Sequence, residues 1–126
     1  MTIRFLLITD PHDSSWQYWL EQALMPLGQL RVVQADYAVS QIAEEEYNIV
    51  IVDATAIEEV ELLASRLRAT RPDCRIVVMT ASPTWQRARA AFEAGAIDYI
   101  PKSFNKDKLL DTFKQILQKP LPAWPR

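Results

Sequence analysis

The stretch YNIVIVDATA, residues 47–56, decides the fold of this chain. Its apolar core, IVIV, is continuous and β-branched, and it stops on a single carboxylate, Asp53. A strand that is apolar on both faces is typical of a parallel sheet covered by helices on both sides. The run RFLLITD, residues 4–10, has the same design and ends on Asp10. Both runs therefore predict buried neighbouring strands that finish on an acid.

Five β-rich runs alternate with helical patterns along the 126 residues. The predicted strands are Ile3–Thr9, Leu30–Gln34, Asn48–Asp53, Arg75–Thr80 and Ile97–Ile100. Apolar residues at three- and four-residue steps predict helices at Ser14–Leu27, Asp36–Tyr47, Ile57–Thr70, Thr84–Ala94 and Asn105–Gln118. We interpret Gly28 and Gly95 as helix C-caps. This alternation predicts an α/β fold of the (βα)5 type, a doubly wound parallel sheet of five strands with helices on both faces.

Composition indicates one ordinary globular domain. The net charge of -2 gives no electrostatic footprint for direct binding of nucleic acid or an anionic membrane, and no apolar stretch approaches the ~20 residues of a membrane span. A single cysteine excludes an internal disulfide, and without a recognisable signal peptide these features indicate a cytoplasmic protein. We expect residues 1–118 to form the domain and the Pro-rich residues 119–126 to be a tail or the start of a linker.

Polar residues stand at the ends of three predicted strands, as Asp10, Asp53 and Thr80, and Lys102 follows the fifth strand. The carboxyl ends of parallel strands share one edge of the sheet, so these side chains are expected to meet there. Two carboxylates held close together repel unless a cation lies between them, and hard oxygen ligands suit Mg²⁺. A carboxylate can also accept a phosphoryl group as a nucleophile, with a hydroxyl and an ammonium offsetting the developing charge.

With these residues in place, the sequence resembles the receiver domain of response regulators in two-component signal transduction, over about residues 3–118. The resemblance is carried by IVIVD ending at Asp53, by RIVVMTA with Thr80, and by AFEAGAIDYIPKSF with Tyr99 and Lys102. It implies the flavodoxin-like strand order 2-1-3-4-5. It also implies a signalling domain rather than an enzyme, phosphorylated by a histidine kinase in a phosphorelay.

The resemblance assigns roles to particular residues. Asp53 is the implied phosphoacceptor, and the implied cofactor is Mg²⁺, held by Asp10, Asp53 and the backbone carbonyl of Thr55. Thr80 and Lys102 are the implied contacts to the phosphoryl group.

Thr80 and Tyr99 form the implied switch. They would change the surface of the fourth helix, fifth strand and fifth helix, which meets a downstream protein or output domain. Pairing of two copies of the chain is a further partner that the resemblance allows.

Three departures from the family pattern leave a second reading open. Thr9 stands where the family usually has an acid, and the segment ATAIEEVELL after Asp53 lacks the usual Met-Pro and glycine. Ser103 follows Lys102 where the family normally has proline in a cis peptide, so this bond is either trans or a strained cis bond. The alternative is a degenerate receiver that binds partners independently of phosphorylation. A small enzyme or nucleotide binder is a third reading, but neither glycine fingerprint for such a site is present.

Aromatic residues and the cysteine have simpler readings. We expect Trp16 and Trp19 to pack partly into the core through the first helix. Trp85 opens the fourth helix, where it serves either an interface or helix-start packing. Cys74 is expected to be a small, inert residue at the start of a strand.

Overall fold

The computed structural model describes residues 2–10 and 14–120. Within that part of the chain, strands and helices alternate as β1 (Ile3–Ile8), α1 (Ser14–Leu24), β2 (Gly28–Val33), α2 (Ala35–Glu44), β3 (Ile49–Asp53), α3 (Val60–Thr70), β4 (Arg75–Thr80), α4 (Trp85–Glu93), β5 (Asp98–Pro101) and α5 (Lys106–Gln118). The strands form one parallel sheet in the order β2-β1-β3-β4-β5. The predicted fold class, flavodoxin-like strand order and alternation are thereby confirmed.

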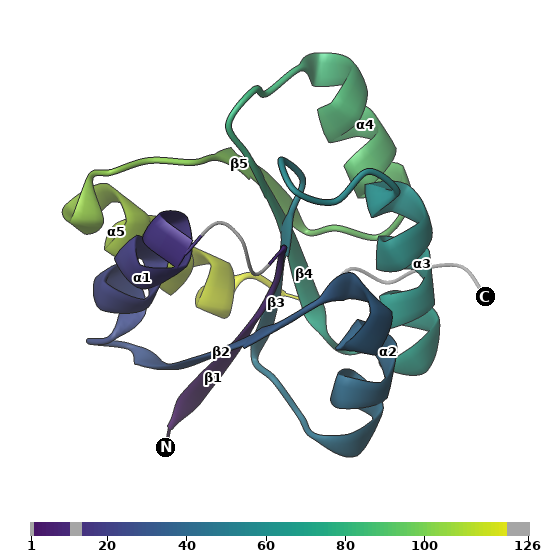
Figure 1. Ribbon diagram of the computed structural model, residues 1–126, viewed down its shortest axis with the longest axis horizontal. Coiled ribbons are helices and arrows are strands. Elements are labelled where there is room, and N and C mark those ends of the chain that lie inside the picture. The colour runs from purple at the N-terminus through teal and green to yellow at the C-terminus, as the bar shows by residue number, and fades with distance from the viewer. Residues whose placement is uncertain (1, 11–13, 121–126) are drawn as a thin grey trace.

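Helices cover both faces of the sheet, with α1 and α5 on one face and α2, α3 and α4 on the other (Figure 1). Successive strand residues point to opposite faces. In β1, Phe5 and Leu7 pack in the core beneath α1 and α5, whereas Leu6 and Ile8 pack in the core beneath α2, α3 and α4. Because both faces are covered, β3 is buried at every residue, as its uninterrupted apolar run predicts.

The same alternation decides where the polar strand ends point. Thr9 continues the series of Phe5 and Leu7, so it falls on the α1 and α5 face, and Asp53 falls on that face in β3. Ile8 pairs with Val52, which makes the next residues of the two strands, Thr9 and Asp53, lateral neighbours. Register alone therefore brings a hydroxyl beside the carboxylate.

Three of the predicted helix boundaries are wrong for identifiable reasons. The second helix ends at Glu44 rather than Tyr47, since the backbone of Glu45 is already extended. The first helix ends at Leu24 rather than Leu27, because Pro26 disfavours helical backbone at the residue before it. The third begins at Val60 rather than Ile57, since the backbone N–H groups of Ala56 and Ile57 bond back to the carbonyl of Asp53 in a turn.

The two glycines have different roles. Gly95 has φ +116° and ends α4, as predicted, and a Cβ there would lie 2.6 Å from Cδ of Arg68. The interpretation of Gly28 as a C-cap is wrong. Gly28 opens β2 opposite Ile3, and an added Cβ would come within 2.0 Å of the Ile3 carbonyl oxygen. This position excludes a side chain by close approach of backbone rather than by its φ angle.

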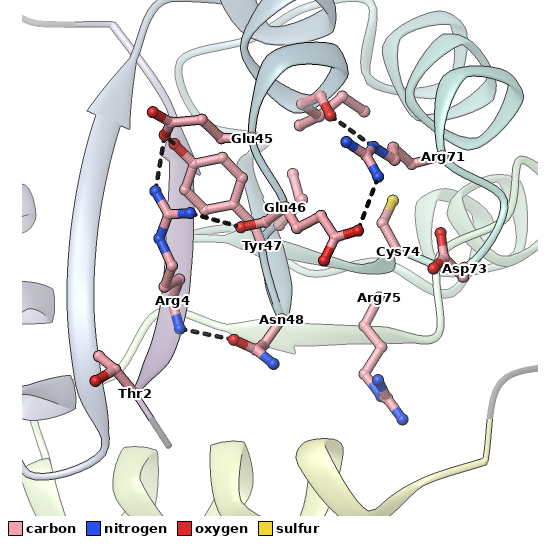
Figure 2. A pocket seen from close by; sticks show the side chains of 12 residues that line it. Thr2, Arg4, Glu45, Glu46, Tyr47, Asn48, Arg71, Asp73, Cys74 and Arg75 are labelled. Carbon is pink, nitrogen blue, oxygen red and sulfur yellow. Dashed lines mark hydrogen bonds and ion pairs between the residues drawn. The ribbon is translucent and has the colours of Figure 1, made fainter.

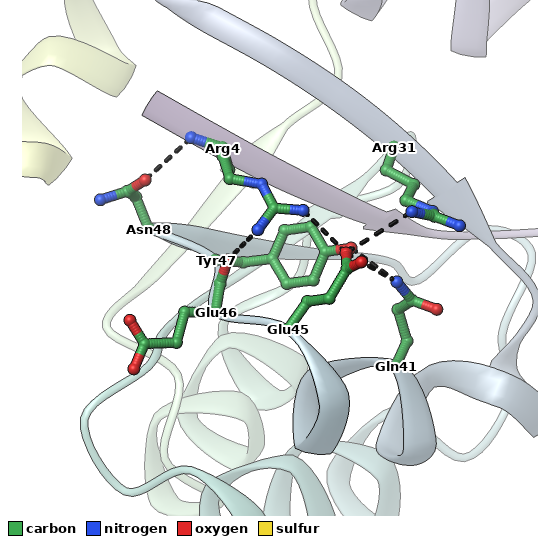
Figure 3. A network of polar contacts seen from close by, with 7 residues as sticks. All are labelled: Arg4, Arg31, Gln41, Glu45, Glu46, Tyr47 and Asn48. Atoms are coloured by element: carbon green, nitrogen blue, oxygen red, sulfur yellow. Dashed lines mark hydrogen bonds and ion pairs between the residues drawn. The ribbon is translucent and has the colours of Figure 1, made fainter. Parts of the chain in front are cut away.

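A polar network links α2 and the residues that follow it to strands β1 and β2 (Figure 3). Oε2 of Glu45 accepts from Nη2 of Arg4 at 2.7 Å, the Tyr47 hydroxyl at 3.0 Å, Nε2 of Gln41 at 3.2 Å and Nη1 of Arg31 at 3.5 Å. The hydrogen bond from Arg4, and then that from Tyr47, hold the pKa of the Glu45 carboxyl below its usual value.

Candidate functional site

Asp53 lies at the end of β3 with its side chain fully buried. Its Oδ1 is 3.0 Å from the Lys102 ammonium and accepts from the backbone N–H of Thr55, also at 3.0 Å. Its Oδ2 accepts a hydrogen bond from the Thr9 hydroxyl at 2.8 Å. The buried charge is thus balanced by one cation and stabilised by two further donors, which is what a carboxylate removed from water requires.

Lys102 reaches Asp53 from the loop that follows β5. Its backbone N–H donates to the carbonyl of Thr80 at 2.8 Å, which extends the pairing of β4 with β5 by one residue. Its side chain is only 9% exposed, and Nζ lies 5.0 Å from the centroid of the Trp16 ring. All peptide bonds of the described segments are trans, so the question raised by Ser103 is answered in favour of a trans bond.

The loop after Asp53 is bonded to the loop after β4. Thr55 donates through its N–H to Asp53, and its Oγ1 accepts from the N–H of Ala81 at 3.0 Å. The segment after Asp53 is therefore held by two hydrogen bonds of Thr55, whose backbone N–H points at the Asp53 carboxylate.

Asp10 is exposed and lines a hollow of about 300 Å³ together with Thr9 and Ala56. Asp10 and Asp53 offer hard oxygens at the ends of adjacent strands, the ligand chemistry that Mg²⁺ prefers. The described residues contain no group of three or more histidine, cysteine, aspartate or glutamate side chains that could hold a metal ion. The chemistry of these two residues fits an Mg²⁺ site that leaves most positions to water, rather than a closed cage.

Thr80 and Tyr99 belong to the other face of the sheet. Thr80 is buried at the end of β4, and its Oγ1 accepts from the N–H of Ser82 at 3.2 Å. Tyr99 packs against the core beneath α2, α3 and α4, and its hydroxyl accepts from the N–H of Thr84 at 3.5 Å. Thr84 in turn caps α4 by accepting from Arg87. Tyr99 is therefore bonded to the start of α4.

A cavity of about 430 Å³ adjoins Tyr99 between the α3 and α4 regions. Arg87 and Ala91 line it from α4, and Thr55 lines it from the loop after β3. The Asp53 loop and the predicted switch tyrosine thus border one cavity.

Of the predicted site residues, the structure shows Lys102 and Thr55 in contact with Asp53, whereas Thr80 Oγ1 bonds to Ser82. Sequence reasoning also missed two partners of the central residues. Thr9 was treated only as a residue standing where an acid is usual. In the structure its hydroxyl donates directly to Asp53. Trp16 was expected to pack partly into the core; it is 3% exposed, and its ring also faces the Lys102 ammonium. The register of β1 against β3 is the signal that could have revealed the bond of Thr9.

A second polar hollow, of about 380 Å³, lies at the opposite edge of the sheet, where the strands begin (Figure 2). Arg4, Arg71 and Arg75 line it, but so do Glu45 and Glu46. Arg4 bonds to Glu45, and Arg71 to Glu46 at 3.2 Å, so these charges compensate one another within the protein. This hollow is remote from Asp53 and plays no part in the site.

Comparison with known proteins places the chain in a family. Residues 12–114 match the response regulator receiver domain. The chain is 32% identical, over 97% of its length, to the DNA-binding transcriptional regulator NtrC of Azospirillum brasilense, of which it spans 26%. A similar relative from Rhizobium meliloti strain 1021 is 31% identical, and the chain spans 25% of it. The chain thus spans about a quarter of the length of these curated relatives.

Solved structures agree with this assignment. A response regulator from Thermotoga maritima superimposes with a TM-score of 0.80 at 27% identity, over 94% of this chain and 100% of that one. A CheY-like receiver domain protein from Methanospirillum hungatei JF-1 gives a TM-score of 0.81 at 22% identity, over 94% and 95% of the two chains, which supports the fold alone.

The chain belongs to the response regulator receiver domain family of two-component signal transduction. It is therefore a signalling module of the phosphoacceptor class, not an enzyme that turns over a substrate, and its family implies a cognate histidine kinase. Receiver domains typically bind Mg²⁺. In the described residues, none of the helices has the length and apolar character needed to cross a membrane.

Proposed function

We propose that this domain accepts a phosphoryl group on Asp53 from a histidine kinase and relays the signal through the surface formed by α4, β5 and α5. The observation that carries the proposal is the ion pair of 3.0 Å between Lys102 Nζ and Asp53 Oδ1, at the carboxyl edge of a doubly wound sheet. An ammonium beside the acceptor carboxylate can offset the negative charge of the phosphoryl group during transfer.

In the proposed step, one carboxylate oxygen of Asp53 attacks the phosphorus of a phosphohistidine on the kinase. The oxygen–phosphorus bond forms while the phosphorus–nitrogen bond breaks, and the electron pair of the broken bond returns to the imidazole, which takes up a proton from water. The product is an acyl phosphate on Asp53. Lys102 and the Thr80 hydroxyl offset the charge of the phosphoryl oxygens.

We assign Mg²⁺ to Asp10, Asp53 and the backbone carbonyl of Thr55. When bound, the ion neutralises negative charge shared by the acceptor and the phosphoryl group. Thr9 supplies a hydroxyl in place of a third acid, so we expect weaker Mg²⁺ binding than three carboxylates would give. Asp10 supplies the exposed carboxylate of the set.

The proposed output runs through Tyr99 to α4. Phosphorylation of Asp53 adds nearly two negative charges at the carboxyl edge of the sheet and would draw the Thr80 hydroxyl towards the phosphoryl group. Tyr99, bonded at Thr84, would then change rotamer and shift α4 between two pre-existing states. On α4, the exposed rings of Trp85 and Phe92 offer apolar contacts to a downstream protein, an output domain or a second copy of this chain.

The test is phosphorylation by a small phosphodonor with Mg²⁺, followed by intact mass. We expect one phosphate on the wild-type chain and none on Asp53→Asn, with Asp98→Asn as a matched aspartate control that still gains it. The absence of an adduct on the wild-type chain, or an adduct that persists in Asp53→Asn, would refute the proposal. We also propose a cytoplasmic location, because a chain with a single cysteine cannot form the internal disulfides that are common in oxidising compartments.

The second candidate is a receiver that binds its partner without phosphorylation. It is favoured by the complete burial of Asp53, both of whose oxygens already accept hydrogen bonds or an ion pair. Because Asp53 has no exposed surface, a donor can reach its carboxylate only if a group that covers it moves. This candidate predicts partner binding that is unchanged in Asp53→Ala and insensitive to Mg²⁺.

A further inference from the structure

We propose that Trp16 and Trp19 of α1 form an aromatic clamp that positions Lys102 for the phosphoryl group. The inference rests on the proposed function, in which Lys102 contacts that group. It adds two positioning residues on a helix that supplies none of the residues predicted for the site.

The first half of the clamp is a contact between a cation and an aromatic face. Nζ of Lys102 lies 5.0 Å from the centroid of the Trp16 ring and 3.0 Å from Oδ1 of Asp53. An ammonium within about 6 Å of an indole face is attracted by the ring, and the attraction is stronger when the pair is removed from water. Here the Lys102 side chain is 9% exposed and Trp16 is 3% exposed.

Packing alone does not explain a tryptophan at residue 16. Its Nε1 is buried and has no acceptor among the described residues. Within the described part of the chain the indole N–H thus gains no hydrogen bond, and leucine or phenylalanine would fill the same part of the core without burying a donor. The ring face presented to Lys102 gives a reason for the larger indole.

The second half of the clamp fastens the loop that carries Lys102. Nε1 of Trp19 donates to the carbonyl of Ser103 at 3.1 Å. The Phe104 ring packs edge-on against Trp16, with centroids 5.9 Å apart, and in a tilted arrangement against Trp19, with centroids 5.4 Å apart. The two residues after Lys102 are therefore attached to α1.

On its other side, the Lys102 N–H attaches the backbone to Thr80 in β4. The lysine is thus held from both α1 and the sheet. A lysine side chain has four rotatable bonds and loses considerable freedom when its head group is fixed. The clamp keeps the ammonium at the acceptor when one carboxylate oxygen becomes bonded to phosphorus and the ion pair with Asp53 weakens.

The first test measures binding of beryllofluoride, a non-covalent mimic of the phosphoryl group, to the full chain in Mg²⁺ by calorimetry. We expect about tenfold weaker binding to Trp16→Leu and a smaller loss for Trp16→Phe, which keeps a ring face. Trp19→Phe, which loses the N–H but keeps the ring, should show a loss of a few-fold. Mg²⁺ affinity should stay within about twofold of wild type in all three variants, and Trp85→Leu is the exposed tryptophan control.

The second test does not depend on phosphorylation. In the wild-type chain, NMR should show the Lys102 Hε protons shifted upfield by the Trp16 ring current, with the assignment checked in Lys102→Arg. The shift should vanish in Trp16→Leu and persist in Trp85→Leu.

The outcomes of these tests distinguish a failure of the aromatic clamp from a failure of the proposed function. Equal beryllofluoride affinity in wild type and Trp16→Leu would overturn the clamp and leave Asp53 as acceptor. No binding of beryllofluoride to the wild type would refute the proposed function instead, and the ring-current shift alone would then decide whether the clamp exists. Loss of Mg²⁺ and beryllofluoride affinity together in Trp16→Leu would mean a general packing role and would also overturn it.

Discussion

The hydroxyl of Thr9 donates a hydrogen bond of 2.8 Å to Oδ2 of Asp53, and both residues are buried. The bond follows from the parallel register of β1 and β3, which sets these two residues side by side. A hydroxyl satisfies the buried carboxylate without adding charge, whereas a second acid at residue 9 would repel it. Thr9 therefore stabilises the buried carboxylate of Asp53 from the neighbouring strand.

Replacing Thr9 by valine should destabilise the fold. The substitution keeps the shape of the side chain but leaves one oxygen of a buried carboxylate without its donor, which costs about 1–3 kcal/mol. Thr9→Ser keeps the hydroxyl and should cost about 1 kcal/mol or less. Urea unfolding monitored by circular dichroism measures both. Equal stability of the two variants would show that the hydrogen bond contributes nothing.

Replacing Thr9 by aspartate should make stability depend strongly on Mg²⁺. Without the ion, the new carboxylate repels Asp53 and lowers the melting temperature; with the ion, the added ligand raises Mg²⁺ affinity and restores it. Thr9→Asn, similar in size but neutral, is the matched control. A melting temperature of Thr9→Asp that does not respond to millimolar Mg²⁺ would contradict the assignment of Asp53 to the metal site.

Removing the Lys102 ammonium should be costly because Asp53 then retains a buried, unpaired charge. We expect Lys102→Met to lower the free energy of unfolding by about 3–5 kcal/mol. Combining it with Asp53→Asn, which removes the charge that needs a partner, should recover a large part of that loss. Chemical denaturation of the four proteins of this cycle gives the coupling free energy. Additive effects would mean that the ion pair of 3.0 Å does not form in solution.

The Glu45 network should give pH-dependent stability with a defined sign. Its pKa is lowered in the folded protein, first by the hydrogen bond from Arg4 and then by that from Tyr47. A carboxyl with a depressed folded-state pKa contributes stability above its unfolded value, and this contribution is lost as the pH falls through the folded-state pKa. The urea midpoint of Glu45→Gln should therefore lie below that of wild type at neutral pH and converge with it at acidic pH.

The exposed neighbour Glu44 provides the control for this prediction. Glu44→Gln should leave the urea midpoint nearly unchanged across the same pH range. A gap between Glu45→Gln and wild type that stays constant down to the acid transition would show that Glu45 is not the titrating group.

Cys74 should be nearly inert in the folded protein, as the sequence predicts. Burial raises the pKa of its thiol from 9.0 to about 11. The reactive thiolate is then roughly 100-fold scarcer near pH 8 than in an unperturbed thiol. Labelling with an alkylating reagent, followed by mass, should be slow in buffer and fast in urea. Rapid labelling of the native chain would show that Cys74 is exposed in solution.

Much of the fold could be predicted from the sequence because a strand buried on both faces is recognisable as a continuous apolar run. The continuous apolar runs ending at Asp10, Asp53 and Thr80 identified the inner strands and put the candidate site at their carboxyl ends. Helix limits were predicted less accurately, since Pro26 and the turn after Asp53 override the apolar period at α1 and α3.

Gly28 shows why local sequence can mislead. A glycine after a helical pattern is typical of a C-cap, but the constraint at residue 28 comes from the carbonyl of Ile3 on a neighbouring strand. No sequence pattern around residue 28 indicates this contact with Ile3. By contrast, Gly95 was predicted correctly because its positive φ is set by the end of α4 itself.

The sequence by itself determined which residues of the strands are buried and which acids, hydroxyl and lysine stand at the strand ends, because these follow from periodicity within single segments. Only the tertiary structure decided what those groups contact. The register of β1 on β3 gave Asp53 the Thr9 hydroxyl, and the packing of α1 against the loop after β5 placed Trp16 over Lys102. Both contacts join segments far apart in the chain, and the distances between such segments are set by the whole folded core.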